Sequence, residues 1–375
     1  MKYYIISGEA SGDLHGSNLI RQIQLLDSGA SIRCWGGDLM RATGATLVKH
    51  YRDLAFMGFA EVISNLPTII RNIRFCKEDI AAWHPDVVIL VDYPGFNLRI
   101  AEWAKQKGFK VVYYISPQVW AWKENRVKKM KQCIDKMLCI LPFEKDYYKN
   151  KWNWDVEYVG HPLVEEIEKS MDNGQRTMDK KTIALLPGSR KQEISKKLPI
   201  MLEVARSFPG YQFVVAKAPG LTDDFYLPFM AQYDNVSSVS NQTYALLAGS
   251  AAALVTSGTA TLETALFGVP EVVCYKGSEI SYQIAKRLIK IKYISLVNLI
   301  MDKLVVKELI QNELTTGNLI KELNELLNNE QRRNELQTDY QALKEILSKG
   351  GHASAQAAQQ IFKMLTTNNQ HLTSI

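Results

Sequence analysis

Residues 252–270 read AALVTSGTATLETALFGVP, and this stretch decides the fold that we expect for the chain. Its first part is a short apolar run that ends in Thr-Ser-Gly at residues 256–258, a pattern typical of a buried parallel strand. Apolar side chains then recur at helical spacing, so we expect a helix with Thr259 as its N-cap and Gly268 as its stop. The stretch predicts a strand-turn-helix unit of an α/β fold.

The turn of this unit is suited to binding an anion. A strand that turns through Ser257 and Gly258 into a helix aims several unpaired backbone N–H groups at one point, and the helix dipole adds partial positive charge there. Glu263 lies about one helical turn further on, close enough to accept hydrogen bonds from two neighbouring hydroxyls, such as a ribose diol. An ordinary βα unit with a surface glutamate is the alternative, and this stretch alone leaves both open.

A second turn of the same kind follows the strand expected at residues 182–186. It reads Pro187-Gly188-Ser189-Arg190, and Glu193 opens the next helix. The guanidinium of Arg190 can bind a phosphate through two N–H groups. Two such turns in one domain can hold a diphosphate between them, although neither matches the GxxxxGK[ST] pattern of a P-loop.

Length and composition describe a globular chain of more than one domain. The chain has 375 residues, of which 46% are hydrophobic and 22% charged, with a formal net charge of +6. A single core rarely grows beyond ~250–300 residues, so we expect two domains. The five cysteines are scattered without zinc-type pairing, which predicts a reduced compartment and no structural metal. No apolar run approaches the ~18–20 residues that cross a bilayer, and an N-terminal strand with a glycine turn predicts no signal peptide.

Strands alternate with helices on both sides of a polar segment without periodicity, residues 168–181, which we interpret as a linker. This alternation predicts two doubly wound, Rossmann-like α/β domains that face each other across a cleft, residues 1–167 and 182–350. The C-terminal third is expected to be helical. After the break at Gly350-Gly351, a last helix over residues 352–367 either returns to the first domain or swaps between the subunits of a homodimer.

The first domain offers two candidate functional turns. Residues 8–16, GEASGDLHG, follow the first strand and suit a tight turn with close backbone approach, either for packing alone or as the wall of a crevice. The apolar run at residues 86–91 ends at Asp92, just before Pro94 and Gly95 break the strand. Ligands of open α/β sheets bind beyond the carboxyl ends of the strands, so Asp92 is placed for chemistry. Simple turn formation is the alternative.

Two further segments combine apolar, aromatic and basic side chains. The apolar residues of the first segment, within residues 54–75, are Phe56, Met57, Phe59, Val62 and Leu66. They form either the buried face of an amphipathic helix or an exposed lip for an acyl chain or a bilayer. The second segment, residues 116–131, places two tryptophans beside five cations: Trp120, Trp122, Lys123, Arg126, Lys128, Lys129 and Lys131. This pattern predicts a membrane interface, while nucleic-acid binding and a solvated helix face are the alternatives.

Eight motifs, in order over nearly the whole chain, resemble those of the lipid-A-disaccharide synthases, which are inverting glycosyltransferases of the GT-B architecture. They are SGEASGD (7–13), DYPGFN (92–97), SPQVWAW (116–122), LPFEK (141–145), GHP (160–162), LPGSR (186–190), SGTATLE (257–263) and SLVNL (295–299). Any one of these motifs, SGTATLE above all, also occurs in other sugar-nucleotide enzymes. The resemblance therefore rests on the whole set.

The resemblance implies a reaction and its partners. UDP-2,3-diacylglucosamine gives its sugar to the 6-hydroxyl of 2,3-diacylglucosamine 1-phosphate, which forms the β-1,6 disaccharide of lipid A and releases UDP. The enzyme would then be cytoplasmic and peripherally bound to the inner membrane of a Gram-negative-type bacterium, with no nucleic acid as a partner. We expect no cofactor and no metal, because no DxD-like or His-rich cluster is evident in the sequence.

The resemblance also implies roles for individual residues. Asp92 is the expected base that takes the proton of the attacking hydroxyl, with His15 and His161 as the alternatives, and Glu9, Ser11 and Asn97 line the acceptor crevice. The expected UDP-sugar site consists of Ser189, Arg190, Glu193, Ser257, Gly258, Thr259, Ala260, Thr261, Glu263, Tyr275 and Asn298. Arg190, the helix N-termini and Asn298 would offset the charge that develops on the departing UDP.

Two rival functions share parts of this pattern. A UDP-N-acetylglucosamine 2-epimerase would have the same two domains and the same diphosphate turns, without needing an acyl-binding rim. A non-catalytic, membrane-associated sugar-nucleotide binding protein would bind UDP without turnover, and Asp92 would be dispensable in it.

Overall fold

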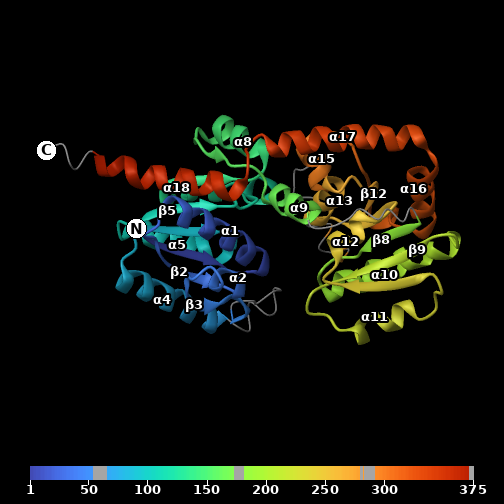
Figure 1. The fold of residues 1–375 in the computed structure, drawn as a ribbon, viewed down its shortest axis with the longest axis horizontal. Helices are drawn as coiled ribbons and strands as arrows, with labels where there is room; N and C mark the ends of the chain where they lie inside the picture. The colour runs from blue at the N-terminus through green and yellow to red at the C-terminus, as the bar shows by residue number, and fades with distance from the viewer. Residues whose placement is uncertain (54–65, 173–180, 279–281, 283–291, 371–375) are drawn as a thin grey trace. The chain divides into compact units, whose positions relative to one another are not determined.

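The fold is given by a computed structural model that describes residues 1–53, 66–172, 181–278, 282 and 292–370 (Figure 1). The chain forms two compact units. The first comprises Met1–Pro162 and Leu347–Ile375, and the second comprises Leu163–Ile346. Each unit is built around one parallel sheet, so both parts of the chain are α/β, as the sequence predicts.

The sheet of the first unit has seven described strands in the order β3-β2-β1-β4-β5-β6-β7, all parallel. They are β1 (Lys2–Ser7), β2 (Ser31–Gly36), β3 (Thr46–His50), β4 (Val87–Val91), β5 (Lys110–Tyr114), β6 (Lys136–Cys139) and β7 (Glu157–Tyr158). The central strand β4 reads VVILV and is buried along its whole length. Such a continuous apolar run is typical of a parallel strand that has helices on both of its faces.

Helices cover both faces of this sheet. They are α1 (Ala10–Leu26), α2 (Asp38–Arg41), α4 (Leu66–Trp83), α5 (Pro94–Gln106), α6 (Val119–Trp122), α7 (Arg126–Cys133), α8 (Pro142–Trp152) and α18 (Ala353–Gln370). Along β1, Tyr4 and Ile6 belong to the core beneath α4 and α5, whereas Tyr3 and Ile5 belong to the core beneath α1 and α18. The side chains of a strand alternate between faces, and one strand therefore fills both cores.

The C-terminal helix α18 lies beside α1 in the first unit (Figure 1). Its apolar face, which includes Ala357, Ala358 and Ile361, is fully buried against the sheet. This confirms that the last helix returns to the first domain, and in this single chain it packs on its own unit. The small alanines let the helix approach closely, and Ile361 supplies apolar area to bury.

Three glycines let the returning chain cross the end of the first domain. A Cβ on Gly350 would lie 2.2 Å from the backbone nitrogen of Gly160, and a Cβ on Gly160 would lie 2.4 Å from the carbonyl oxygen of Gly351. Gly160 also has a φ of +88°, in the left-handed region that favours glycine. The backbones pass too close for any side chain, so this crossing requires glycine on both segments.

The second unit repeats the design with six described parallel strands in the order β10-β9-β8-β11-β12-β13. The strands are β8 (Thr182–Leu186), β9 (Gln212–Lys217), β10 (Val236–Ser240), β11 (Ala252–Thr256), β12 (Glu271–Tyr275) and β13 (Lys307–Ile310). Its helices are α9 (Pro162–Asp172), α10 (Lys191–Glu203), α11 (Asp223–Met230), α12 (Thr243–Ala248), α13 (Thr259–Leu266), α15 (Leu296–Met301), α16 (Thr316–Asn328) and α17 (Glu330–Ser348). Among the described residues, no helix is both long and apolar enough to span a bilayer.

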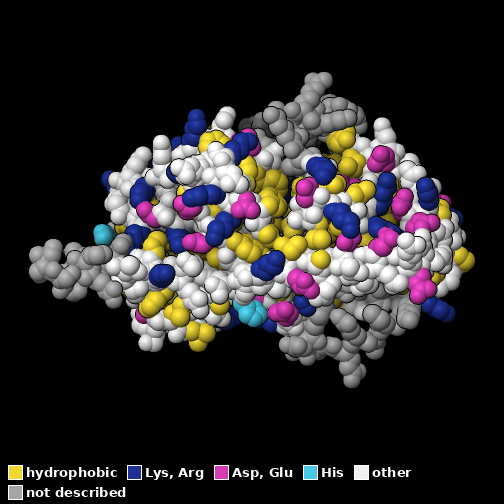
Figure 2. Space-filling model, turned by 90° about the horizontal axis from the view of Figure 1, so that it is seen from above, with side chains coloured by type: hydrophobic (Ala, Val, Ile, Leu, Met, Phe, Trp, Pro, Cys, Tyr) yellow, Lys and Arg dark blue, Asp and Glu magenta, His cyan; other side chains and the backbone are white. Residues whose placement is uncertain are grey.

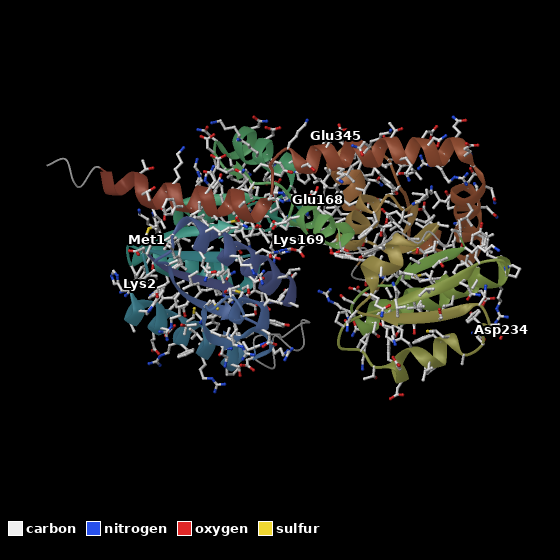
Figure 3. The ribbon with its side chains drawn as sticks, in the orientation of Figure 1. Met1, Lys2, Glu168, Lys169, Asp234 and Glu345 are labelled. Carbon is white, nitrogen blue, oxygen red and sulfur yellow. The ribbon has the colours of Figure 1, made fainter. Side chains whose placement is uncertain are left out.

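The structure corrects three expectations about secondary structure. The C-terminal third is not wholly helical, because the strand β13 lies there; its four residues, KELI, are too few to show the period of a strand, and its two buried residues are adjacent. The expected linker, residues 168–181, begins as helix, since α9 continues to Asp172 and carries Glu168 and Lys169 (Figure 3). The N-cap of α13 is Gly258 rather than Thr259. Residues 279–281 and 283–291 of the C-terminal third lie outside the described residues.

A carboxyl group is buried in the second unit without a hydrogen-bond partner. Glu271 opens β12 and is 1% exposed, and neither of its carboxyl oxygens has a partner among the described residues. Burial raises the pKa of Glu271 well above its ordinary value, because the charged form loses its hydration. The native fold therefore favours the protonated, neutral form of this side chain.

Glu271→Gln should remove a pH dependence from the stability of the protein. The native state keeps a proton on Glu271 that the unfolded state releases above the ordinary pKa of 4.5. Its contribution is complete below that pH and is lost as the pH rises toward the folded pKa, by about 1.4 kcal/mol per pH unit. Urea unfolding across this pH range should show that the free energy of unfolding declines with pH in the wild type relative to Glu271→Gln. Glu345→Gln, a change at an exposed glutamate, is the control and should decline like the wild type. If the free energy of unfolding depended on pH in the same way in the wild type and in Glu271→Gln, the raised pKa of Glu271 would be wrong.

Candidate functional site

The strand order creates one crevice in each sheet. β1 lies between β2 and β4, and β8 lies between β9 and β11, so the chain reverses its direction of winding at these two strands. At such a switch point the two connections leave on opposite faces, which opens a crevice at the carboxyl ends of the strands. In the first unit this brings Glu9 close to Asp92 and Gly8 close to Tyr93. In the second it brings Ser189 close to Ser257.

The crevice of the second unit holds a cavity of about 370 Å³. The predicted residues that line it are Ser189, Arg190, Glu193, Ser257, Gly258, Thr259, Ala260 and Glu263. Both predicted turns therefore contribute to one cavity. The lining residues that we did not predict include Ala216, Lys217, Ala218, Pro219, Thr243 and Thr256. Several of them lie at the end of β9, so the same rule of strand ends would have found them.

The two turns leave backbone N–H groups available at the start of α10 and α13. Gly188 and Gly258 have φ angles of +117° and +131°, which only glycine adopts readily. The N-caps of these helices, Arg190 and Gly258, make no side-chain capping bond. The third amide of each helix, that of Glu193 or Thr261, donates to the carbonyl of the N-cap residue. The two amides before it have no acceptor within the helix and can donate to a ligand in the cavity, where the helix dipoles also favour negative charge.

Ionisable groups of both signs line this cavity. The guanidinium of Arg190 lies 3.2 Å from the carboxylate of Glu193, and the ammonium of Lys217 pairs with Asp223. Burial raises the pKa of Glu263 to about 7. A hydroxyl that donates a hydrogen bond to this carboxylate would favour its charged form and lower that pKa. The lining therefore offers donors that suit an anion and a carboxylate that can accept hydrogen bonds from hydroxyl groups.

Thr261 and Tyr275, both expected in this site, do not line the cavity. Thr261 is buried, and its hydroxyl donates to the carbonyl of Gly258 at 2.8 Å, so it shapes the turn from inside. Burial, and then the nearby carboxylate of Glu193, raise the pKa of Tyr275, and Glu193 is one of the residues that line the cavity.

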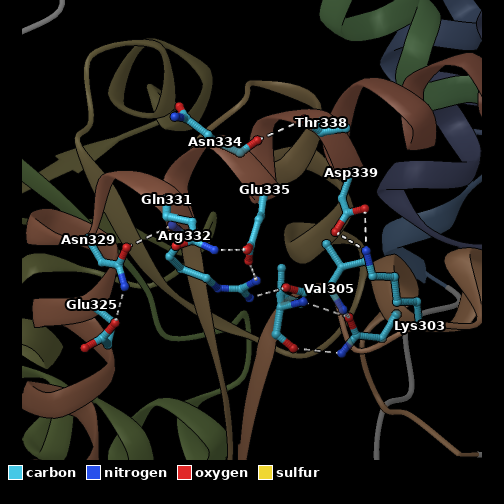
Figure 4. Close-up of polar contacts among 12 residues, drawn as sticks. Lys303, Val305, Glu325, Asn329, Gln331, Arg332, Asn334, Glu335, Thr338 and Asp339 are labelled. Carbon is cyan, nitrogen blue, oxygen red and sulfur yellow. Dashed lines mark hydrogen bonds and ion pairs between the residues drawn. The ribbon is translucent and has the colours of Figure 1, made fainter.

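Asn298 is a correction to the predicted site. Its amide nitrogen donates to the carbonyl of Val306 at 2.8 Å and to the carboxylate of Glu308 at 2.9 Å, and its oxygen accepts the backbone N–H groups of Val305 and Val306. A fully buried amide must satisfy its polar atoms inside the protein, and here it does so by shaping a loop. The same loop is tied to α17, where Arg332 donates to the carbonyl of Val305 and Lys303 pairs with Asp339 (Figure 4).

The crevice of the first unit presents a carboxylate on strained backbone. Asp92 and Tyr93 follow β4 with φ angles of +45° and +49°, a left-handed conformation that is unfavourable for both residues. The carbonyl of Asp92 accepts hydrogen bonds from the buried amide of Asn97 at 2.7 Å and from the hydroxyl of Tyr113 at 2.6 Å. Asn97 is thus a support for Asp92, placed beneath the crevice.

The electrostatics of Asp92 suit a proton acceptor. Burial, and then the carboxylate of Glu9, raise the pKa of Asp92 to about 6. A carboxylate with this pKa is ionised at neutral pH and holds a proton more strongly than an ordinary aspartate. Ser11, also expected in the acceptor crevice, is exposed on the first turn of α1.

The glycine turn after β1 is needed for the position of Tyr93. A Cβ on Gly8 would lie 2.3 Å from the Tyr93 ring, which is closer than carbon atoms can pack. The ring also stacks on Phe96 with centroids 5.8 Å apart. Gly8 therefore makes room for the residue that follows Asp92.

The predicted membrane residues are only partly within the described structure. Phe56, Met57, Phe59 and Val62 lie outside the described residues, as does the side chain of Trp122. Leu66 is 49% exposed at the start of α4. Trp120 is half-buried, and its indole N–H donates to the buried Glu144 at 3.2 Å, so this ring is anchored inside the fold. The described cations are Lys123, which is half-buried, and Arg126, Lys128 and Lys129, which are exposed.

The whole chain matches one protein family. The family model described as lipid-A-disaccharide synthetase covers residues 3–363. The chain is 39% identical over 365 residues to the lipid-A-disaccharide synthase of Syntrophus aciditrophicus, a match that covers 94% of this chain and 95% of that protein. The chain belongs to this family. It is therefore a glycosyltransferase of lipid A biosynthesis, as its eight motifs indicate.

Solved structures show that the fold also occurs in proteins outside this family. The UDP-GlcNAc 2-epimerase of Neisseria meningitidis bound to UDP-GlcNAc superposes with a TM-score of 0.64 at 14% identity, over 98% of this chain and all of that one (100%). The calicheamicin glycosyltransferase gives a TM-score of 0.61 at 14% identity, with 98% of each chain covered. These neighbours show the GT-B fold alone. The family match, and not the fold, separates the enzyme from the epimerases.

Gly8→Ala should lower the turnover of the enzyme. The added methyl group must displace the Tyr93 ring and with it the strained backbone of Asp92, and a shift of about 1 Å in a reacting group can cost roughly 100-fold in rate. Disaccharide formation should be assayed beside Gly29→Ala, where the methyl would lie 3.6 Å from its nearest neighbour, an ordinary contact. Equal turnover in Gly8→Ala and Gly29→Ala would show that the crevice does not depend on this close approach.

Proposed function

We propose that the enzyme transfers 2,3-diacylglucosamine from UDP-2,3-diacylglucosamine to the 6-hydroxyl of 2,3-diacylglucosamine 1-phosphate, and releases UDP. The family supports the joining of two monosaccharides. The observation that carries the choice of donor is the cavity of the second unit, where two glycine turns and two helix N-termini line one space. Such a space fits a nucleoside diphosphate.

The diphosphate of the donor accounts for the two turns. The phosphate oxygens accept hydrogen bonds from the backbone amides at the start of α10 and α13. Arg190 also donates hydrogen bonds to these oxygens once its guanidinium turns away from Glu193. The ribose hydroxyls donate to Glu263, whose burial makes an unpaired negative charge costly. Arg190 and the helix N-termini then offset the charge that develops on UDP as the glycosidic bond breaks.

The crevice of the first unit supplies the base. In a single in-line displacement, the 6-hydroxyl oxygen forms a bond to the anomeric carbon while the bond from that carbon to the UDP oxygen breaks. The hydroxyl proton passes to Asp92, and the electron pair of the broken bond leaves with UDP. Glu9 raises the proton affinity of Asp92, and Asn97 and Tyr113 hold its backbone in place.

Asp92→Asn tests this assignment directly. A positioned base is worth about 10²–10⁴-fold, so turnover should fall by that factor while donor binding is retained. In the wild type, kcat/KM should rise with pH up to about 6 and then level off, because the carboxylate acts only when deprotonated. The residual activity of Asp92→Asn should not show this rise of kcat/KM between acid pH and about pH 6. Near-normal turnover of Asp92→Asn would exclude Asp92 as the base.

Glu9→Gln is the matched variant for the same pH profile. Removing the Glu9 charge lowers the pKa of Asp92, since that charge is one cause of its elevation. The acid limb should therefore move to lower pH while activity persists at neutral pH. If the acid limb of the kcat/KM profile stayed at the same pH in Glu9→Gln, a group other than Asp92 would be responsible for it.

We also propose that the enzyme works at the cytoplasmic face of the inner membrane and binds it peripherally. Its substrates carry acyl chains, and α4 exposes apolar side chains, with Leu66 49% and Ile70 59% exposed beside Arg71 and Arg74. On the face seen in Figure 2, Lys and Arg side chains are interspersed with Asp and Glu, so positive charge is not gathered there. Compared with the face in Figure 2, the surface of α4, which combines apolar and cationic groups, is the better candidate for a bilayer contact.

Liposome flotation tests the membrane contact. The double variant Leu66→Ser and Ile70→Ser removes two exposed apolar groups, each worth about 1.5–3 kcal/mol when fully buried, so binding to anionic vesicles should weaken at least ten-fold. Leu227→Ser is the control, because Leu227 is 57% exposed in the other unit. Binding that is unchanged in the double variant would rule out α4 as the contact.

A further inference from the structure

A buried ammonium group lies behind the cavity of the second unit. The side chain of Lys197, on the second turn of α10, is 3% exposed. Its ammonium donates to the hydroxyl of Thr256 and lies 4.0 Å from the carboxylate of Glu193. Both of these partners line the cavity, whereas Lys197 itself does not.

Lys197 stands at the junction of the two glycine turns. Thr256 ends β11 immediately before the turn at Ser257 and Gly258. On the other side, a Cβ placed on Gly188 would lie 3.5 Å from the Lys197 ammonium. The nitrogen is therefore within a few ångströms of both turns, at the point where β8 and β11 run side by side.

The protein itself compensates the charge of Lys197 only weakly. Among the described residues, the carboxylate nearest to it is that of Glu193, which also pairs with Arg190 at 3.2 Å. Burial lowers the pKa of Lys197, while Glu193 and the buried thiol of Cys274 oppose this shift. A buried cation with weak pairing is costly, and an anion brought into the cavity would relieve that cost.

We propose that Lys197 is a positioning residue for the diphosphate of the sugar nucleotide. It holds the two turns at a fixed separation through Thr256 and Glu193, and its charge makes the cavity favour a ligand with two phosphates over one with fewer. The inference rests on the proposed donor site and deepens it. It explains why a lysine occupies an interior position that an apolar residue of similar length would fill at lower cost.

The test is binding of UDP, UMP and uridine to Lys197→Met, measured by calorimetry. Methionine keeps the length of the side chain and removes the charge. UDP affinity should fall roughly ten-fold or more, as for the loss of a charged partner, with a smaller loss for UMP and little change for uridine. The melting temperature should be unchanged or higher, because an apolar isostere replaces a buried charge. A merely structural lysine would instead lower the melting temperature and weaken all three ligands alike.

Two further variants complete the design. Lys196→Met removes the same charge from an exposed position on the same helix and should leave the UDP affinity unchanged. Lys197→Gln keeps a donor for Thr256 without the charge and should behave like Lys197→Met. Wild type that fails to bind UDP would overturn the proposed donor site. The role of Lys197 alone would be overturned if the wild type bound UDP and both Lys197 variants bound it with the same affinity. It would also be overturned if both variants lost affinity for UDP and for uridine by the same factor.

Discussion

In each parallel sheet the chain starts in the middle, builds outward on one side, and then crosses to the other side of its first strand. This order constrains everything at the carboxyl edge of the sheet. The two neighbouring strands at the switch point send their connections to opposite faces, so no helix closes the space between them. Loop residues far apart in sequence, such as Gly188 and Gly258, consequently share one cavity wall. The crevices follow from topology before any particular side chain is considered.

The two switch points use the same geometry with opposite electrostatics. In the first unit, Asp92 and Glu9 bring two carboxylates together, which raises the proton affinity of Asp92. In the second, Arg190 and two helix N-termini line the cavity, with Lys197 behind it, and they supply positive charge beside the carboxylates of Glu193 and Glu263. A glycosyl transfer to a hydroxyl needs both halves, a group that accepts a proton and a group that stabilises a departing phosphate. One fold, used twice in the same chain, supplies each half separately.

The sequence predicts the strands and turns better than it predicts the contacts of single side chains. Buried parallel strands are continuous apolar runs, and β8 therefore has the bounds that the sequence predicts, residues 182–186. The short strand β13 was missed, because four residues carry too little pattern. Asn298 was placed in the donor site because it belongs to a motif, yet its amide is used inside the fold. For Lys197 the sequence predicts nothing, since a lysine in a helix is ordinarily exposed and only packing shows that this one is buried.

A perturbed pKa does not by itself identify the catalytic group, and the position of each group in the sheet makes the distinction. Burial raises the pKa of Glu144 to about 7, but this carboxyl is 1% exposed and accepts a backbone N–H and an indole N–H, so it holds a loop. Glu271 is equally buried, at the amino end of its strand. His161 is buried with its pKa lowered to about 3, which makes it a weak base. Asp92 alone among these four combines a raised pKa with partial exposure, strained backbone and a place at the carboxyl edge of a switch point. The strain persists because Asn97 and its neighbours impose it, and a fold that gained nothing from this carboxylate would have no reason to keep it there.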